Sequence, residues 1–101
     1  MNEVKRIDFS ANVNALGRGS GFGGQIPIEE FPLGKAVCLS DRFPSQYEAA
    51  MKPIWLTRTD TELVIESAYK SGSIPLEPWK KFSINDIGLS YATCDLDIYV
   101  Q

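Results

Sequence analysis

Apolar and polar residues alternate strictly near the start of the chain. Between residues 4 and 13 one face collects the apolar side chains, which are Ile7, Phe9, Ala11 and Val13. The other face carries polar side chains. A period of two over this length is typical of a strand with one buried face. The pattern therefore predicts a half-buried strand at 4–13.

Further segments rich in β-branched, aromatic or other apolar residues predict short strands. They are the ranges 35–40, 54–59, 62–69, 87–92 and 96–100, with 81–84 as a short addition. Asp60 and Thr61 suit a tight turn, so 54–59 and 62–69 are expected to form a hairpin. We expect a last hairpin between 87–92 and 96–100, with its turn at residues 93–95.

Signals for a helix are confined to residues 45–51. Ser45 can cap the helix, Glu48 follows three residues later as in a capping box, and Pro53 ends the segment. Two segments are predicted to be loops. Residues 16–34 form a Gly/Pro-rich loop, in which 16–24 hold five of the eight glycines, and 70–78 contain glycine, serines and two prolines.

These elements predict a mainly β protein. The 101 residues suit a single domain over 1–101, and 44% hydrophobic and 11% aromatic residues predict a packed core rather than a disordered chain. We expect an antiparallel sheet, curled or sandwiched, with one short helix near 45–51. An α+β arrangement, with that helix packed on one face of the sheet, is the alternative.

The chain contains no histidine, which removes the commonest general base and metal ligand. Cys38 and Cys94 are expected to be reduced thiols, with Cys38 buried; a disulfide between them is the alternative. Asp95 follows Cys94 directly and would raise its thiol pKa. Asp95-x-Asp97, with Asp86 nearby, lacks the ligand spacing of a calcium loop. We therefore predict no enzyme, no cofactor and no metal site.

The string Gly19–Gly24 matches the G-x-G-x-x-G pattern of dinucleotide-binding loops. Such a site needs a helix that begins directly after the glycines, and Pro27 prevents one. We expect a flexible loop instead. Two alternatives remain open: the loop inserts into a partner through Arg18 and Phe22, or residues 17–24 bind a small ligand or nucleotide with help from Arg18 and Lys35.

Two tryptophans carry different expectations. Trp55 lies in an apolar strand and is predicted to belong to the core. Trp79 lies in a proline-bounded loop beside Lys80 and Lys81, and we expect it to be a lid on the core. The alternative for Trp79 is an exposed anchor in an interface.

Charge is distributed unevenly. The net charge is −3, with seven basic and six acidic residues in 1–58 but three basic and seven acidic residues in 59–101. An acidic chain without a basic stripe is not expected to bind nucleic acid directly. No apolar run reaches the roughly 18 residues of a membrane span, and no signal peptide is visible. We expect a cytoplasmic protein that does not enter the membrane.

In size, acidity and lack of catalytic apparatus, the chain is similar to bacterial immunity proteins that neutralise basic toxins and to phage-encoded inhibitors of defence systems. This resemblance implies a non-catalytic binding protein that occludes a basic partner, such as a nuclease toxin. An accessory subunit of a larger assembly is a further alternative. The candidate contacts are Asp60, Glu62, Glu66, Trp79, Asp86, Tyr91, Asp95, Asp97 and Tyr99.

Overall fold

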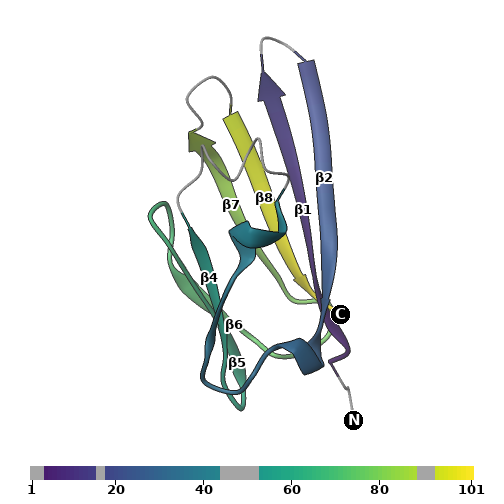
Figure 1. Ribbon diagram of the computed structural model, residues 1–101, viewed down its shortest axis with the longest axis vertical. Coiled ribbons are helices and arrows are strands. Elements are labelled where there is room, and N and C mark those ends of the chain that lie inside the picture. Colours follow the sequence, from purple (N-terminus) through teal and green to yellow (C-terminus); the bar gives the residue numbers. More distant parts are fainter. Residues whose placement is uncertain (1–3, 16–17, 44–52, 89–92) are drawn as a thin grey trace.

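Two four-stranded antiparallel sheets make up the described part of the chain (Figure 1). The computed structural model describes residues 4–15, 18–43, 53–88 and 93–101. Sheet A has the order β2-β1-β8-β7, with β1 at Arg6–Ala15, β2 at Arg18–Pro27, β7 at Lys81–Gly88 and β8 at Thr93–Val100. Sheet B has the order β3-β4-β5-β6, with β3 at Ala36–Cys38, β4 at Ile54–Arg58, β5 at Glu62–Ser67 and β6 at Gly72–Pro75.

The mainly β prediction is confirmed. The strand expected at 4–13 is β1, and the hairpin expected at 54–69 is β4–β5, closed where the Thr59 N–H donates to the Glu62 carbonyl at 2.9 Å. The described helical turns are two short 3-10 turns, η1 at Ile28–Glu30 and η2 at Leu39–Arg42. Within the described residues no helix is long and apolar enough to cross a membrane. The helix predicted near 45–51 lies outside the described residues.

The described residues form an apolar core between the two sheets. Sheet A contributes the alternating residues of β1 and β8, and sheet B contributes alternating residues of β4 and β5. The fully buried members include Ile7, Leu96, Ile98, Leu56 and Ile65. Burying one such side chain stabilises the fold by about 1.5–3 kcal/mol. The period-two pattern of each strand therefore decides which of its faces points inward.

Hydrogen bonds hold two connecting segments against strand β4 of sheet B. The buried hydroxyl Oγ of Ser40, in η2, accepts a hydrogen bond of 3.0 Å from the backbone N–H of Ile54 at the start of β4. The Arg58 guanidinium donates to the carbonyls of Ile28 and Phe31 at 3.3 and 3.4 Å. The Arg58 bonds therefore link the β2–β3 connection, which leaves sheet A, to sheet B, whereas the Ser40 bond fixes the β3–β4 connection within sheet B.

The predicted loop at 16–34 is wrong for residues 18–27, which form strand β2. This strand pairs with β1 over ten residues without a shift of register. The ladder outweighs the entropic cost of ordering glycine because β1 supplies packing that β2 lacks. The Phe9 ring lies over Gly24, where an added Cβ would come within 2.9 Å of the ring atom Cζ. Phe22 also packs inward, with its ring centroid 5.0 Å from that of Phe43.

Several boundaries also differ from the sequence predictions. Residues 72–75, expected in a loop, form the short edge strand β6, which tolerates Pro75 at its end. The turn expected at 93–95 is part of β8, because Cys94 is buried and continues the alternation of that strand. The expected strand at 35–40 is shorter, since β3 ends at Cys38 and η2 begins at Leu39. Of the strand expected at 87–92, residues 87 and 88 end β7 and the rest lies outside the described residues.

Both tryptophan predictions fail. Trp55 is 43% exposed, because Ile54 and Leu56 point into the core and the residue between them must face outward. Trp79 is 79% exposed and is not a lid on the core. The cysteines are free thiols, as expected, although Cys38 is half-buried rather than buried.

Candidate functional site

The outward-facing side chains of sheet A form a polar surface, which we call the outer face. Its centre consists of two adjacent rows from β1 and β8, which pair in register. The facing pairs are Asp8 with Tyr99, Ser10 with Asp97, Asn12 with Asp95 and Asn14 with Thr93. The alternation that buries Ile7, Phe9 and Leu96 places all eight of these residues on the side away from the core.

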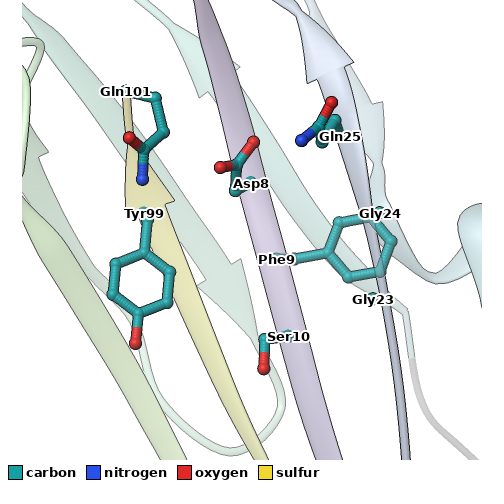
Figure 2. A pocket seen from close by; sticks show the side chains of 8 residues that line it. All are labelled: Asp8, Phe9, Ser10, Gly23, Gly24, Gln25, Tyr99 and Gln101. Atoms are coloured by element: carbon teal, nitrogen blue, oxygen red, sulfur yellow. The ribbon is translucent and has the colours of Figure 1, made fainter.

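Strand β2 adds almost no side chains to the outer face. Gly19, Gly21 and Gly23 lie opposite the polar residues of β1, so backbone alone forms the surface there. Two shallow depressions result. The Tyr99 depression, of about 580 Å³, is lined by Asp8, Phe9, Ser10, Gly23, Gly24, Gln25, Tyr99 and Gln101 (Figure 2). The Asp95 depression, of about 480 Å³, is lined by Asn12, Val13, Asn14, Gly19, Gly21, Thr93 and Asp95.

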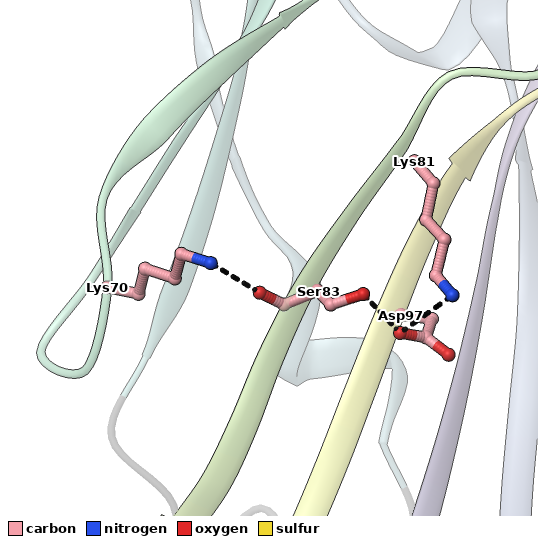
Figure 3. Close-up of polar contacts among 4 residues, drawn as sticks. All are labelled: Lys70, Lys81, Ser83 and Asp97. Atoms are coloured by element: carbon pink, nitrogen blue, oxygen red, sulfur yellow. Dashed lines mark hydrogen bonds and ion pairs between the residues drawn. The ribbon is translucent and has the colours of Figure 1, made fainter.

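At the Tyr99 end of the outer face, neighbouring groups engage the carboxylates. The Arg6 Nε lies 2.9 Å from the Asp8 Oδ1. The Ser83 hydroxyl donates a hydrogen bond of 2.6 Å to the Asp97 Oδ1, and the Lys81 Nζ lies 3.8 Å from the same oxygen (Figure 3). The Lys81 Nζ also lies 5.5 Å from the centroid of the Tyr99 ring. The acidic groups at this end are therefore balanced by cations within the chain.

The Asp95 end presents several oxygen acceptors. A carboxylate, two amides and a threonine hydroxyl are among the groups that line the Asp95 depression. Carboxylate and amide oxygens are acceptors for ammonium and guanidinium groups. The geometry at this end suits a lysine or arginine side chain of a partner. Among the described residues no group of three potential metal ligands is present.

The nine predicted contact residues do not form one surface. Asp95, Asp97 and Tyr99 do lie together, as consecutive outward residues of β8. Asp60, Glu62 and Glu66 belong instead to the β4–β5 hairpin of sheet B. There Glu66 lies opposite Trp55, and the Glu62 Oε2 accepts a hydrogen bond of 2.9 Å from the Ser73 hydroxyl.

The other predicted contacts have separate positions. Trp79 precedes β7, and Asp86 lies in β7 with a side chain that is not described. Tyr91 lies outside the described residues. Of the residues proposed for the glycine segment, Phe22 points to Phe43, Lys35 is exposed before β3, and the Arg18 side chain is not described. The structure thus supports only the β8 part of the predicted set as a group.

Sequence reasoning missed the β1 half of the outer face, which consists of Asp8, Ser10, Asn12 and Asn14. The alternation did place polar residues of 4–13 on one face. It did not show that β8, at the far end of the chain, pairs beside them. That pairing is a long-range contact, and local periodicity carries no signal for it.

Cys94 does not have the character of a nucleophile. Its side chain is buried in β8 under the outer face. Burial raises the pKa of the Cys94 thiol above its ordinary value, and the neighbouring Asp95 carboxylate raises it further, in the direction expected from the sequence. The thiol therefore stays neutral at physiological pH.

Trp79 stands at the end of sheet A where β7 begins. Its φ is 73°, and its N–H donates a hydrogen bond of 2.6 Å to the Val100 carbonyl. A left-handed conformation costs a residue with a side chain about 1–2 kcal/mol. The fold therefore holds the Trp79 backbone in a strained conformation, with the indole highly exposed beside the last strand.

Comparisons with protein-family models, with curated proteins and with solved structures find no match to this chain.

Proposed function

We propose that the protein is a small non-catalytic binding protein that uses the outer face of sheet A to cover a basic surface of a protein partner. The observation that supports this most strongly is the register of β1 with β8, which sets Asn12 beside Asp95 and Ser10 beside Asp97. The Asp95 depression would accept a lysine or arginine of the partner. Backbone ladders on both sides hold these side chains, so little ordering is needed on binding.

The activity that fits this surface is occlusion. A four-stranded sheet presents a broad area, and the carboxylates on it would be complementary to a basic active site such as that of a nuclease toxin. The exposed Trp79 at the end of the sheet supplies an aromatic anchor of the kind enriched in interface hot spots. An immunity protein or an inhibitor of a nuclease is the class that we propose.

The alternative of a nucleotide-binding glycine segment has less support. Gly19–Gly24 lie in an extended strand that pairs with β1. The helical turn that follows, η1, carries Glu29 and Glu30 in its first turn, where their charge opposes a phosphate. This arrangement differs from the glycine loop and helix N-terminus that hold a pyrophosphate.

A matched pair of charge reversals tests the proposal. Asp95→Lys changes the outer face, and Glu66→Lys makes the same change of charge on the exposed side of sheet B. Immobilised wild-type chain and both variants are exposed to a lysate of the native host, after unfolding curves confirm that all three are folded. We expect a basic partner that the wild type and Glu66→Lys retain and that Asp95→Lys binds at least about tenfold more weakly, as for loss of a charged contact.

Salt provides the second measurement. Association with the captured partner is expected to slow as ionic strength rises, since exposed charges are screened beyond about 8–10 Å in 0.1–0.15 M salt. Equal binding by all three proteins would contradict the use of the outer face. A complex that is indifferent to both Asp95→Lys and salt would contradict the electrostatic basis of the proposal.

A further inference from the structure

The two edges of sheet A are β2 and β7, and only β7 is covered among the described residues. A strand at the edge of a sheet presents unpaired N–H and C=O groups that can pair with another chain. Native proteins cover such edges with lysines, bulges, prolines or short strands. In Figure 1 β2 lies at the margin of the molecule with no described segment beyond it.

The alternation of hydrogen bonds along the β1–β2 ladder shows which backbone groups of β2 point away from β1. Arg6 and Gln101 exchange backbone hydrogen bonds on the β8 side of β1, whereas the Lys5 carbonyl accepts the N–H of Ile28 on the β2 side. Odd-numbered residues of β1 therefore bond to even-numbered residues of β2, in steps of two. The backbone groups that remain at the open edge belong to Gly19, Gly21, Gly23 and Gln25.

Strand β2 lacks the features that normally prevent pairing. Residues 19–26 contain no charged side chain, and their register with β1 has no bulge. Three of the four residues whose backbone groups point away from β1 are glycines. No side chain on these glycines would hinder the approach of another strand. Pro27 has no N–H and limits the open edge to the residues before it.

The other edges are covered or short. On β7 the Lys70 Nζ donates a hydrogen bond of 3.0 Å to the outward-facing carbonyl of Ser83 and lies 4.9 Å from the centroid of the Phe82 ring (Figure 3). The register of β7 with β8 is also irregular between Ile84 and Ile87. In sheet B the edge strands have three and four residues, and the longer one ends at a proline.

We propose that two copies of this chain pair through β2, antiparallel and about a twofold axis, to form a continuous eight-stranded sheet. One register pairs all four outward-facing residues: Gly19 of one copy with Gln25 of the other, and Gly21 with Gly23. Each such pair exchanges two hydrogen bonds, which gives about eight bonds. A second copy is the fitting occupant because the uncharged segment 19–26 meets itself without repulsion between like charges.

The dimer would extend the outer face of each chain. Its formation does not depend on the proposed binding function. The glycines of both copies would lie side by side and form one trough, with the polar β1 rows as its two walls. Because Gly19 of one copy lies opposite Gln25 of the other, the Asp95 depression of each copy would adjoin the Tyr99 depression of its neighbour. The second copy would thus join the outer faces of the two chains into one continuous surface.

A charge swap at the edge tests this register. Gln25 is exposed, and a Cβ at Gly19 meets nothing within 4 Å, so both positions accept longer side chains. In Gly19→Lys/Gln25→Lys each introduced lysine opposes another lysine, whereas in Gly19→Lys/Gln25→Glu each opposes a glutamate. Sedimentation equilibrium up to millimolar concentration is expected to give twice the chain mass for the wild type and the lysine–glutamate variant, and a monomer for the lysine–lysine variant.

A second pair of variants alters the backbone donor alone. Gly19→Pro removes an outward N–H without removing a bond to β1 and is expected to dissociate the dimer, whereas Gly19→Ala keeps the N–H and the dimer. Unfolding curves verify the fold of each variant. A monomeric wild type would overturn the proposal. Equal masses for the two charge variants, or for the proline and alanine variants if both fold, would overturn it as well.

Discussion

The edges of sheet A show two ways to end a sheet. On β7, Lys70 caps the Ser83 carbonyl and the register with β8 is irregular between Ile84 and Ile87, so this edge is protected. On β2, glycines leave the edge bare, and the strand is held by its neighbour, since the Phe9 ring of β1 occupies the space over Gly24. The difference teaches that a strand nearly without side chains can be well ordered when the adjacent strand supplies its packing. Its outer edge then stays open for pairing.

The largest effect is expected from removing the ring that holds β2. Phe9 is buried and its ring centroid lies 5.7 Å from that of Phe43, so Phe9→Ala is expected to cost about 3–5 kcal/mol of unfolding free energy. Phe82 on β7 covers Gly72 in a similar way but is only half-buried. Phe82→Ala should cost less. Urea unfolding measures both, and an equal or larger loss for Phe82→Ala would contradict the comparison.

The next largest effect on stability is expected to differ between two glycines of β2, because their surroundings differ. A Cβ at Gly23 would lie 2.7 Å from the backbone oxygen of Phe9, so Gly23→Ala is expected to cost about 1–3 kcal/mol through overpacking. Gly19 has open space, and Gly19→Ala should leave stability unchanged or raise it by about 0.4–1 kcal/mol through the unfolded chain. Thermal unfolding of both variants and the wild type measures the two changes in stability. Equal losses at both positions would show that β2 does not pair with β1 as described.

A smaller change is expected where β7 begins. Trp79→Gly and Trp79→Ala both delete the exposed indole, but only glycine adopts the φ of 73° without strain. The glycine variant is therefore expected to be more stable than the alanine variant by about 1 kcal/mol. Denaturant midpoints compare the two. Equal midpoints would indicate that this turn is not strained.

The smallest effect on stability, below about 1 kcal/mol, is expected from opening the β7 edge with Lys70→Ala. Its effect on association is larger. Once the Ser83 carbonyl and its strand are uncovered, both edges of the sheet can pair, and species above the dimer should form. Sedimentation velocity detects them. A Lys70→Ala variant with an unchanged size distribution would mean that Lys70 does not protect the edge.

Local patterns in the sequence predicted most of the strands. Alternation at 4–13 and the β-branched runs at 54–69 set which residues are buried, and the structure follows them. The same alternation would have placed Trp55 outside, since its neighbours Ile54 and Leu56 are the core residues. The prediction for Trp55 was wrong because it followed the usual burial of tryptophan instead of the period-two alternation of the strand.

Two features were beyond local reasoning. Strand β2 was predicted as a loop because its stability comes from Phe9 and from the ladder with β1, not from its own residues. The outer face depends on the pairing of β1 with β8, residues from opposite ends of the chain. Asp95, Asp97 and Tyr99 were among the predicted contacts, and the structure sets them in one row of β8, whereas the acids of the β4–β5 hairpin belong to another sheet.

Amide hydrogen exchange, resolved by residue and repeated over a range of protein concentrations, tests the open β2 edge most directly. The N–H groups of Gly19, Gly21 and Gly23 are expected to exchange rapidly in dilute solution and slowly in concentrated solution. Phe22 and Gly24, which bond to β1, should be protected throughout, and the outward N–H of Ser83 on β7 should not respond to concentration. Exchange at these glycines that is independent of concentration, or a response of Ser83 equal to theirs, would contradict the account.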